Sequence, residues 1–455
     1  MDLKQEFEIE GNWWLPNEPN NKSYGTLSYS PRQGVFLSLV ERLDEPGNPR
    51  ISVLLGESFA SQKITLINVI VERGNFPFNQ RVLLSASSVL LNIHYHKKED
   101  IKFSSISVTI PEIFPWFKKS RIKFNERNPL KTIELQPANS FNLEVNDFEL
   151  EVGTTFGSST YKPVQDEFTL KQIGYYTFSP KKGELNFDEC LLIIENVNLF
   201  FAIACNLDFV SQEISGLSND RAVEIVIPPY KEIKKQDISD IDYNILFYVD
   251  NFVEDFKTQF TNWYLNLETY KFLYDLYARI SFKSLSGHIE NQFINIIQAL
   301  ETFHRINYEG LYMNPQIYQS KVYSKIAEEL SKIQIDSNLR DSLKARLKYG
   351  NEISLRNRLK QLLKEHWNFK VLFIPDHDRF VKTVVDKRNF ITHLDPQAGN
   401  LHYIQGFEFA KATKILFYLL KYCLMLSMGV REDRIHKVML SHRDRLSYEE
   451  YFNRS

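Results

Sequence analysis

The chain has 455 residues, of which 43% are hydrophobic and 25% are charged, a composition typical of a folded globular protein rather than a disordered one. This length exceeds one ordinary hydrophobic core, so we expect two or three domains. The net charge of −2 excludes a globally basic nucleic-acid binder, and any polyanion site must be a local patch. Cys190, Cys205 and Cys423 are widely spaced, which predicts neither a disulfide framework nor a zinc site and fits a reducing compartment.

The N-terminus, Met1–Glu6, is polar and acidic and lacks the basic-then-apolar order of a signal peptide. The most apolar run, Ile415–Val430, contains Lys421 and is shorter than the roughly 20 residues that a membrane span needs. We interpret this run as a buried helix and expect a location in the cytoplasm.

In the first half of the chain, apolar and polar residues alternate with a period of two. The alternation is clear in the segments 64–70, 105–110 and 141–145, and this pattern predicts half-buried strands. Turn-forming residues separate the strands at 45–49, 73–75 and 179–183. Residues from about 8 to 227 are therefore predicted to form an antiparallel sandwich or barrel.

The period changes after Pro228-Pro229 and the polar stretch that follows them. Apolar residues then recur at helical spacing in the segments 252–264, 289–304, 318–333, 337–348, 354–367, 377–394 and 406–429. We predict an α+β multidomain protein with a β-rich domain over residues 1–228, a linker over 229–245 and an all-helical bundle over 246–455.

The most usable chemistry lies in the sequence Arg388-Asn389-Phe390-Ile391-Thr392-His393. Pro396 disfavours helical geometry just before it, so the helix should end close to His393. The negative end of a helix dipole favours imidazolium, which predicts proton transfer by His393 near neutral pH. Arg388 stays charged and offers a fork of donors to phosphate oxygens, and Asn389 could orient the nucleophile or a phosphate oxygen.

Helical geometry places Lys382, Asp386, Asn389 and His393 along one polar face, because they are three or four residues apart. Arg388 lies about 140° around the helix axis from His393. The two side chains therefore diverge on a single helix, which predicts a working cleft completed by a second subunit.

This region resembles the HEPN superfamily, helical bundles with an Arg-x(4–6)-His motif that often begins Arg-Asn, and Arg388-Asn389 followed by His393 is a full match. The upstream helix 293–305 resembles the corresponding helix of the ApeA-type branch. The segments Gly11–Pro16, Gly25–Tyr29 and Gly34–Leu37 are similar to the β-rich N-terminal domain of ApeA proteins, which are bacterial anti-phage abortive-infection proteins.

The resemblance implies a metal-independent endoribonuclease that activates the RNA 2′-OH and leaves a 2′,3′-cyclic phosphate and a 5′-OH. His393 would be the general acid/base, and Arg388 would stabilise the charged transition state. It also implies a homodimer or larger homo-oligomer, tRNA as the RNA attacked, and a β domain that senses a phage-derived trigger.

Further candidates lie on the helices around this motif. Residues 311–370 contain 12 Lys and Arg against 6 Asp and Glu, an excess that could face RNA or could be an ordinary solvated surface. Within and near this stretch we select the RNA-binding candidates Lys382, Lys387, Arg356 and Arg358. Glu301 and His304, one helical turn apart, could support the motif across the bundle or simply border the core.

Two other protein classes stay open. One is a non-catalytic HEPN module for dimerisation or RNA binding, with a ligand sensor in the β domain. The other is a lectin or receptor that uses Trp13 and Trp14 as a platform. His94 and His96 share a strand face but lack a third ligand. No nucleotide-binding or zinc motif is present in the sequence, so we predict no cofactor and no metal.

Overall fold

The computed structural model describes residues 2–43, 49–72, 82–110, 113, 116–117, 122–125, 132–136, 140–156, 160–162, 167–205, 213–228, 253–281, 288–393 and 406–452. The chain divides into two compact units, Met1–Tyr264 and Leu265–Ser455. The predicted linker, 229–245, lies outside the described residues.

The N-terminal unit begins with a closed antiparallel barrel. Its strands are β1 (Phe7–Trp14), β2 (Ser23–Ser30), β3 (Gly34–Leu39), β4 (Arg50–Ser58), β5 (Lys63–Val71) and β6 (Val82–Leu91). They follow the order β6–β3–β2–β1–β4–β5, and β5 pairs again with β6. Closure pairs both edges of the barrel sheet. The inward-facing residues, such as Trp13 and Leu37, are buried, which confirms the prediction from the period of two.

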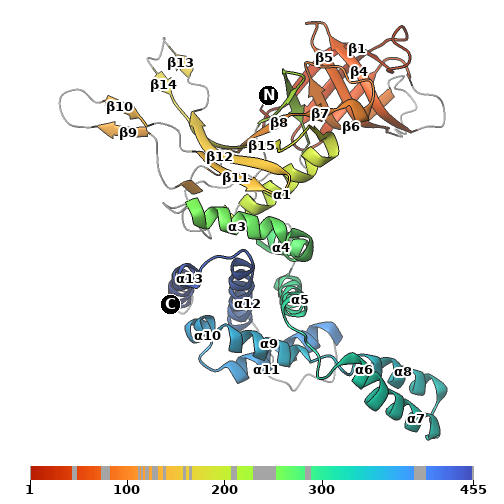
Figure 1. The fold of residues 1–455 in the computed structure, drawn as a ribbon, viewed down its shortest axis with the longest axis vertical. Helices are drawn as coiled ribbons and strands as arrows, with labels where there is room; N and C mark the ends of the chain where they lie inside the picture. Colours follow the sequence, from red (N-terminus) through yellow and green to blue (C-terminus); the bar gives the residue numbers. More distant parts are fainter. Residues whose placement is uncertain are drawn as a thin grey trace. The chain divides into compact units, whose positions relative to one another are not determined.

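The barrel sheet continues into an antiparallel extension (Figure 1). In spatial order, the added strands are β18 (Arg221–Val226), β17 (Glu213–Ser218), β8 (Ser105–Ile110), β15 (Gln172–Pro180), β12 (Phe148–Phe156) and β11 (Ser140–Val145). Short pairs are formed by β7 (Lys102–Phe103) with β16 (Leu185–Asn186), β9 (Ile122–Asn125) with β10 (Thr132–Leu135), and β13 (Thr160–Lys162) with β14 (Glu167–Thr169); η1 (Lys98–Asp100) is a single 3₁₀ turn.

Two helices pack against this extension. Helix α1 (Phe187–Cys205) lies within the β-rich segment that was predicted to form an antiparallel sandwich or barrel. Its apolar residues lie on most sides, so the sequence offers no clear helical stripe. Tyr176 of β15 donates a hydrogen bond to Asn198 of α1 at 2.8 Å. Helix α3 (Val253–Leu265) packs its aromatic rings on α1, with the centroids of Phe200 and Phe260 4.9 Å apart. Nearly all of α3 therefore belongs to the N-terminal unit.

The C-terminal unit is helical, which confirms the predicted bundle. Its helices are α4 (Leu267–Ser281), α5 (Ile289–Asn307), α6 (Pro315–Tyr318), the π-helical turn η4 (Gln319–Tyr323), α7 (Ser324–Lys332), α8 (Ser337–Lys348), α9 (Leu355–Glu365), α10 (Trp367–Phe373), α11 (His377–His393), α12 (Gly406–Ser427) and α13 (Glu432–Phe452). Helix α12 is the central element: α5, α10 and α13 pack against it, and its Leu416, Leu420 and Cys423 are buried.

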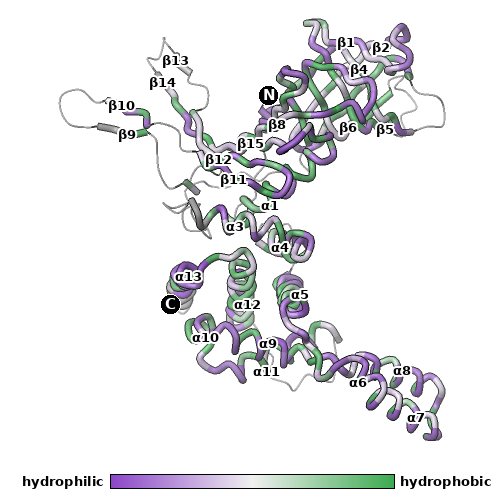
Figure 2. Tube along the Cα trace, viewed as in Figure 1, coloured by the Kyte–Doolittle hydropathy of each residue, from purple (hydrophilic) through white to green (hydrophobic). Residues whose placement is uncertain are grey.

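Figure 2 shows the apolar character of α12 and the mixed polar and apolar residues along α7 and α8. None of the described helices combines the length and the apolarity that a bilayer span requires.

Candidate functional site

The predicted motif lies on the last two turns of α11. Val381 and Val384 are buried on one side of this helix, and α11 packs against α9. On the other side, Lys382 and Asn389 are exposed, as the predicted polar face requires. The apolar stripe of α11 therefore fixes the orientation of the motif relative to the bundle.

Arg388 and Asn389 lie side by side at the surface. Nη1 of Arg388 donates to Oδ1 of Asn389 over 3.3 Å, and the hydroxyl of Thr392 donates to the Arg388 carbonyl over 2.6 Å. Arg388 is half-buried, and it forms no ion pair with any carboxylate of the described residues. Among the described residues, no carboxylate therefore competes with an anion for this guanidinium. His393 is the last residue of α11; its side chain lies outside the described residues.

The other RNA-binding candidates have different environments. Lys387 is only 6% exposed, and its Nζ lies 4.4 Å from the centroid of the Phe409 ring, so this ammonium contributes a cation–π contact to the core. Arg358 is 2% exposed. Neither side chain is placed to meet RNA at the surface. Arg356 and Lys382 are exposed, and Arg356 approaches Asp386 of α11 at 3.8 Å.

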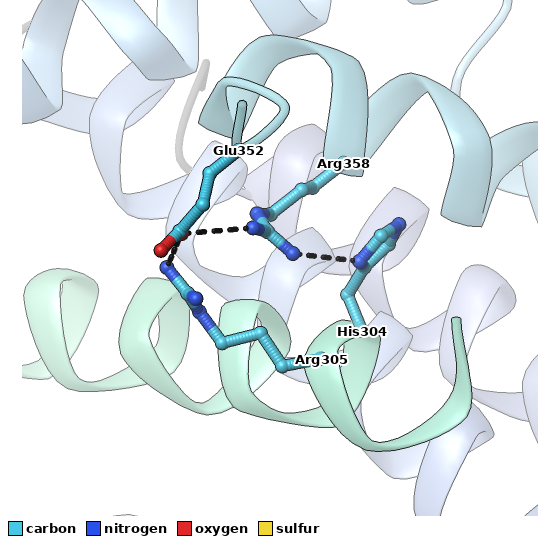
Figure 3. Close-up of polar contacts among 4 residues, drawn as sticks. All are labelled: His304, Arg305, Glu352 and Arg358. Carbon is cyan, nitrogen blue, oxygen red and sulfur yellow. Dashed lines mark hydrogen bonds and ion pairs between the residues drawn. The ribbon is translucent and has the colours of Figure 1, made fainter. Parts of the chain in front are cut away.

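Arg358 instead belongs to a buried polar cluster that joins α5 to α9 (Figure 3). Its Nη1 lies 3.0 Å from Nδ1 of His304, and its Nη2 lies 3.3 Å from Oε2 of Glu352. Arg305 binds the same oxygen of Glu352 at 2.6 Å. The second ring nitrogen of His304 lies 2.9 Å from Oε1 of Gln361. Both ring nitrogens of His304, which is fully buried, are therefore satisfied.

The bonds of this cluster define the protonation state of His304. An arginine can only donate, so Nδ1 of His304 accepts and Nε2 carries the proton that it donates to Gln361. Burial lowers the pKa of His304, the bond to Gln361 partly offsets that effect, and the charges of Arg358 and Arg305 lower the pKa further. The imidazole is therefore held neutral, and it is not a free acid or base for catalysis.

The predicted partnership of Glu301 and His304 with the motif is not seen. His304 contacts α9 and stacks on Tyr308, with ring centroids 4.8 Å apart. Among the described contacts, no bond links His304 or Glu301 to α11.

The sequence contains a signal for this cluster in its helical stripes. His304 continues the apolar stripe of α5, and Arg358 is four residues from Leu362 on the buried face of α9. A polar residue in each of two apolar stripes predicts that the two meet in the core. Selecting Arg358 for its charge alone overlooked this pattern.

The candidate sites of the N-terminal unit are structural. Trp13 is fully buried, and its indole donates to the Gly25 carbonyl over 3.1 Å. Trp14 is 6% exposed and stacks edge-on against His94. Both tryptophans are therefore covered by other residues of the N-terminal unit and do not form an exposed platform. His94 binds the Gly56 carbonyl at 2.8 Å, and no cluster of potential metal ligands occurs in the described parts of the chain.

A cavity of about 510 Å³ opens in the N-terminal unit, beside β11, β12 and α3. Its lining includes Glu144, Glu149 and Lys257 but none of the predicted site residues.

The comparisons with known families agree with this division of the chain. The profile described as ApeA N-terminal domain 1 matches residues 8–263, and the profile described as Apea-like HEPN matches residues 294–434. No curated protein and no solved structure matches the chain. The first match covers more than half of the chain and the second covers the helices that carry the motif, so the chain belongs to the ApeA family. It is a defence-related HEPN protein with an ApeA N-terminal domain.

Proposed function

We propose that the protein is a metal-independent endoribonuclease of anti-phage defence, and that its active site is formed by Arg388, Asn389 and His393 on α11. The observation that carries the proposal is an arginine at the surface of the HEPN bundle without a carboxylate partner among the described residues. A structural arginine is normally paired, as Arg358 is. An arginine without such a partner at the start of an Arg–Asn–His motif suits a phosphate.

The proposed reaction needs proton transfer and stabilisation of negative charge from these residues. His393, at the C-terminal end of α11, removes the proton of the ribose 2′-OH and returns one to the leaving 5′ oxygen. Arg388 stabilises the extra negative charge on the phosphorus centre as the 2′ oxygen attacks. The products are a 2′,3′-cyclic phosphate and a 5′-OH, and tRNA is the proposed substrate.

The divergence of the two residues supports a site shared by two chains. Five residues of an α-helix turn through about 500°, which places Arg388 and His393 roughly 140° apart around α11. We propose that two copies of the bundle associate, so that the arginine of one copy and the histidine of the other face one cleft. The N-terminal unit is the proposed sensor of a phage-derived trigger.

The test compares wild type with His393→Ala and Arg388→Ala in phage-infected bacteria. Arg379→Ala is the matched control, because it removes an exposed arginine from the same helix. We expect wild type and the control to restrict phage growth and to produce RNA fragments with 5′-OH ends. In both motif variants, the amount of RNA with 5′-OH ends should fall by a factor of about 10² or more.

The purified protein should cut tRNA equally well with and without EDTA. Equal RNA ends in wild type and in both motif variants would reject the nuclease. Phage restriction that survives the loss of either motif residue would instead support a non-catalytic HEPN module.

A further inference from the structure

Residues 314–350, which we call the arm, form an excursion between α5 and α9 (Figure 1). The arm contains α6, η4, α7 and α8. Neither α7 nor α8 contains a buried residue. Burial of an apolar face is what stabilises most helices in proteins, so the two long helices of the arm contribute little to the core of their own bundle.

The segments where the arm joins the bundle, which we call its root, are nevertheless held by several hydrogen bonds. The side chain of Asn351 accepts from the Met313 amide at 3.0 Å and donates to the Met313 carbonyl at 2.8 Å. Tyr318 donates to the Leu347 carbonyl over 2.6 Å, which joins α6 to the end of α8. Leu311 pairs with Glu352 in a β-bridge. These bonds fix the direction in which the arm leaves the bundle.

The root is also connected to the buried cluster. Glu352, which forms the β-bridge, is the residue that binds both Arg305 and Arg358. Gly310 adopts φ +62°, and a Cβ at this position would lie 2.6 Å from Nη1 of Arg358. A glycine is therefore required where the chain passes Arg358 and enters the arm. The root is held by hydrogen bonds, whereas α7 and α8 contain no buried residue. This combination indicates that the surface of the arm binds a partner.

The charge of the arm indicates the chemistry of this partner. Seven basic residues stand against four acidic ones, a surplus of three in a chain of net charge −2. Three of the carboxylates are engaged within the arm: Glu328 and Glu329 bind Lys332, and Asp336 caps the N-terminus of α8. Five cations form no ion pair with the described residues: Lys321, Lys325, Lys344, Arg346 and Lys348.

Four of the five free cations are arranged in two short rows. Lys344 and Lys348 are four residues apart on α8, and Lys321 and Lys325 have the same spacing on η4 and α7. Residues with this spacing share one face of a helix. Such rows suit a chain of phosphates, which carries a charge at regular intervals.

Aromatic residues extend this surface towards α11. Tyr349, next to Lys348, is 70% exposed, and Tyr312 is 58% exposed. The hydroxyl of Tyr312 accepts a hydrogen bond from Asn357 of α9 at 3.0 Å. On the same turn of α9, Arg356 approaches Asp386, two residues before Arg388. Exposed aromatic rings beside free cations are the usual components of a surface that binds single-stranded or looped RNA.

We infer that the arm is the RNA-docking element of this HEPN bundle. Its lysines contact the phosphates of a structured RNA, and Tyr349 stacks on an unpaired base. The inference rests on the proposed function, because it supplies the substrate contacts that the motif on α11 lacks. The arm also exposes Ile326, Ile333 and Leu339, each between 41% and 50%. A protein partner would use these side chains, but it would not account for five unpaired cations.

The test measures binding of a transcribed tRNA to the full-length chain by fluorescence anisotropy, over a series of KCl concentrations. All proteins carry His393→Ala, so that cleavage does not interfere. The arm variants are Lys344→Glu with Lys348→Glu, and Tyr349→Ala. The charge-matched control is Lys364→Glu with Lys437→Glu, which alters two exposed lysines of the same unit outside the arm.

We expect the arm double variant to bind at least about tenfold more weakly. The slope of log K against log salt should fall by about two, roughly one for each lysine that no longer neutralises a phosphate. Tyr349→Ala should weaken binding at least about fivefold. The control should stay within about twofold of its parent.

Equal affinity of the arm double variant and the control overturns the inference. A second result would also overturn it. If the triple variant Ile326→Ser with Ile333→Ser and Leu339→Ser lowers the molar mass of the protein in solution, and the lysine variant binds RNA normally, the arm is a protein interface. Binding through the arm without cleavage by the wild-type chain would reject the nuclease and leave the docking element standing. Cleavage by wild type, with no contribution of the arm to RNA binding, would support the nuclease and reject the docking element.

Discussion

Replacing Arg358 by alanine measures how strongly the buried cluster holds α5 and α9 together. The side chain is 2% exposed and forms hydrogen bonds to His304 at 3.0 Å and to Glu352 at 3.3 Å. Removing one partner of a buried ion pair costs about 3–5 kcal/mol. Glu352 is 30% exposed and keeps its contact with Arg305, so we expect the lower end, about 3 kcal/mol. This free energy corresponds to a roughly 150-fold larger opening constant.

Hydrogen exchange of the α9 amides, followed by mass spectrometry, reports this opening directly, with the amides of the barrel as an internal reference. The matched control is Arg356→Ala, two residues away on α9. Arg356 is 45% exposed, and its contact with Asp386 is long, at 3.8 Å. Such a surface contact contributes less than about 1 kcal/mol. Similar protection of α9 in the two variants would show that the cluster does not stabilise the bundle, and the reasoning from its geometry would fail.

Two further predictions concern the same cluster. Because the pKa of His304 is lowered in the folded protein, the unfolded chain takes up a proton below about pH 6.5 that the folded chain does not, and the free energy of unfolding should fall as the pH decreases. His304→Gln should reduce this slope by up to about 1.4 kcal/mol per pH unit in urea titrations, while His366, whose pKa burial also lowers, keeps part of it; an unchanged slope would contradict the neutral state assigned to His304. Gly310→Ala should destabilise the C-terminal unit more than Gly406→Ala does, since both have positive φ but only Gly310 faces Arg358; the strain of the backbone alone is about 1–2 kcal/mol, and equal melting temperatures would show that Arg358 yields without cost.

The period of the hydrophobic pattern predicted both fold classes, because half-buried strands and amphipathic helices impose different periods on the sequence. It failed for α1, whose apolar residues do not form one stripe. It also gave no account of the closure of the barrel, since a strand's partners are set by contacts that are distant in sequence.

The candidate site on α11 could be selected from the sequence, but the environment of the cations around it could not. Residue types and spacing predicted Arg388, Asn389 and His393 as the candidate site, because an arginine can bind a phosphate and a histidine can transfer a proton near neutral pH. The same reasoning treated Arg358 and Lys387 as exposed cations. Only the structure shows that Lys387 lies over Phe409 and that Arg358 faces His304.

Local sequence was enough to establish the order of the two domains, the helix that carries the motif and the family to which the chain belongs. These features depend on periodicity and on residues close together in the chain. Tertiary packing separates the buried cations from the free ones. That distinction depends on what packs against each side chain. Arg358 is held by residues 54 and 6 positions away, whereas η4, α7 and α8 contain no buried residue, so Lys321, Lys325 and Lys348 stay exposed.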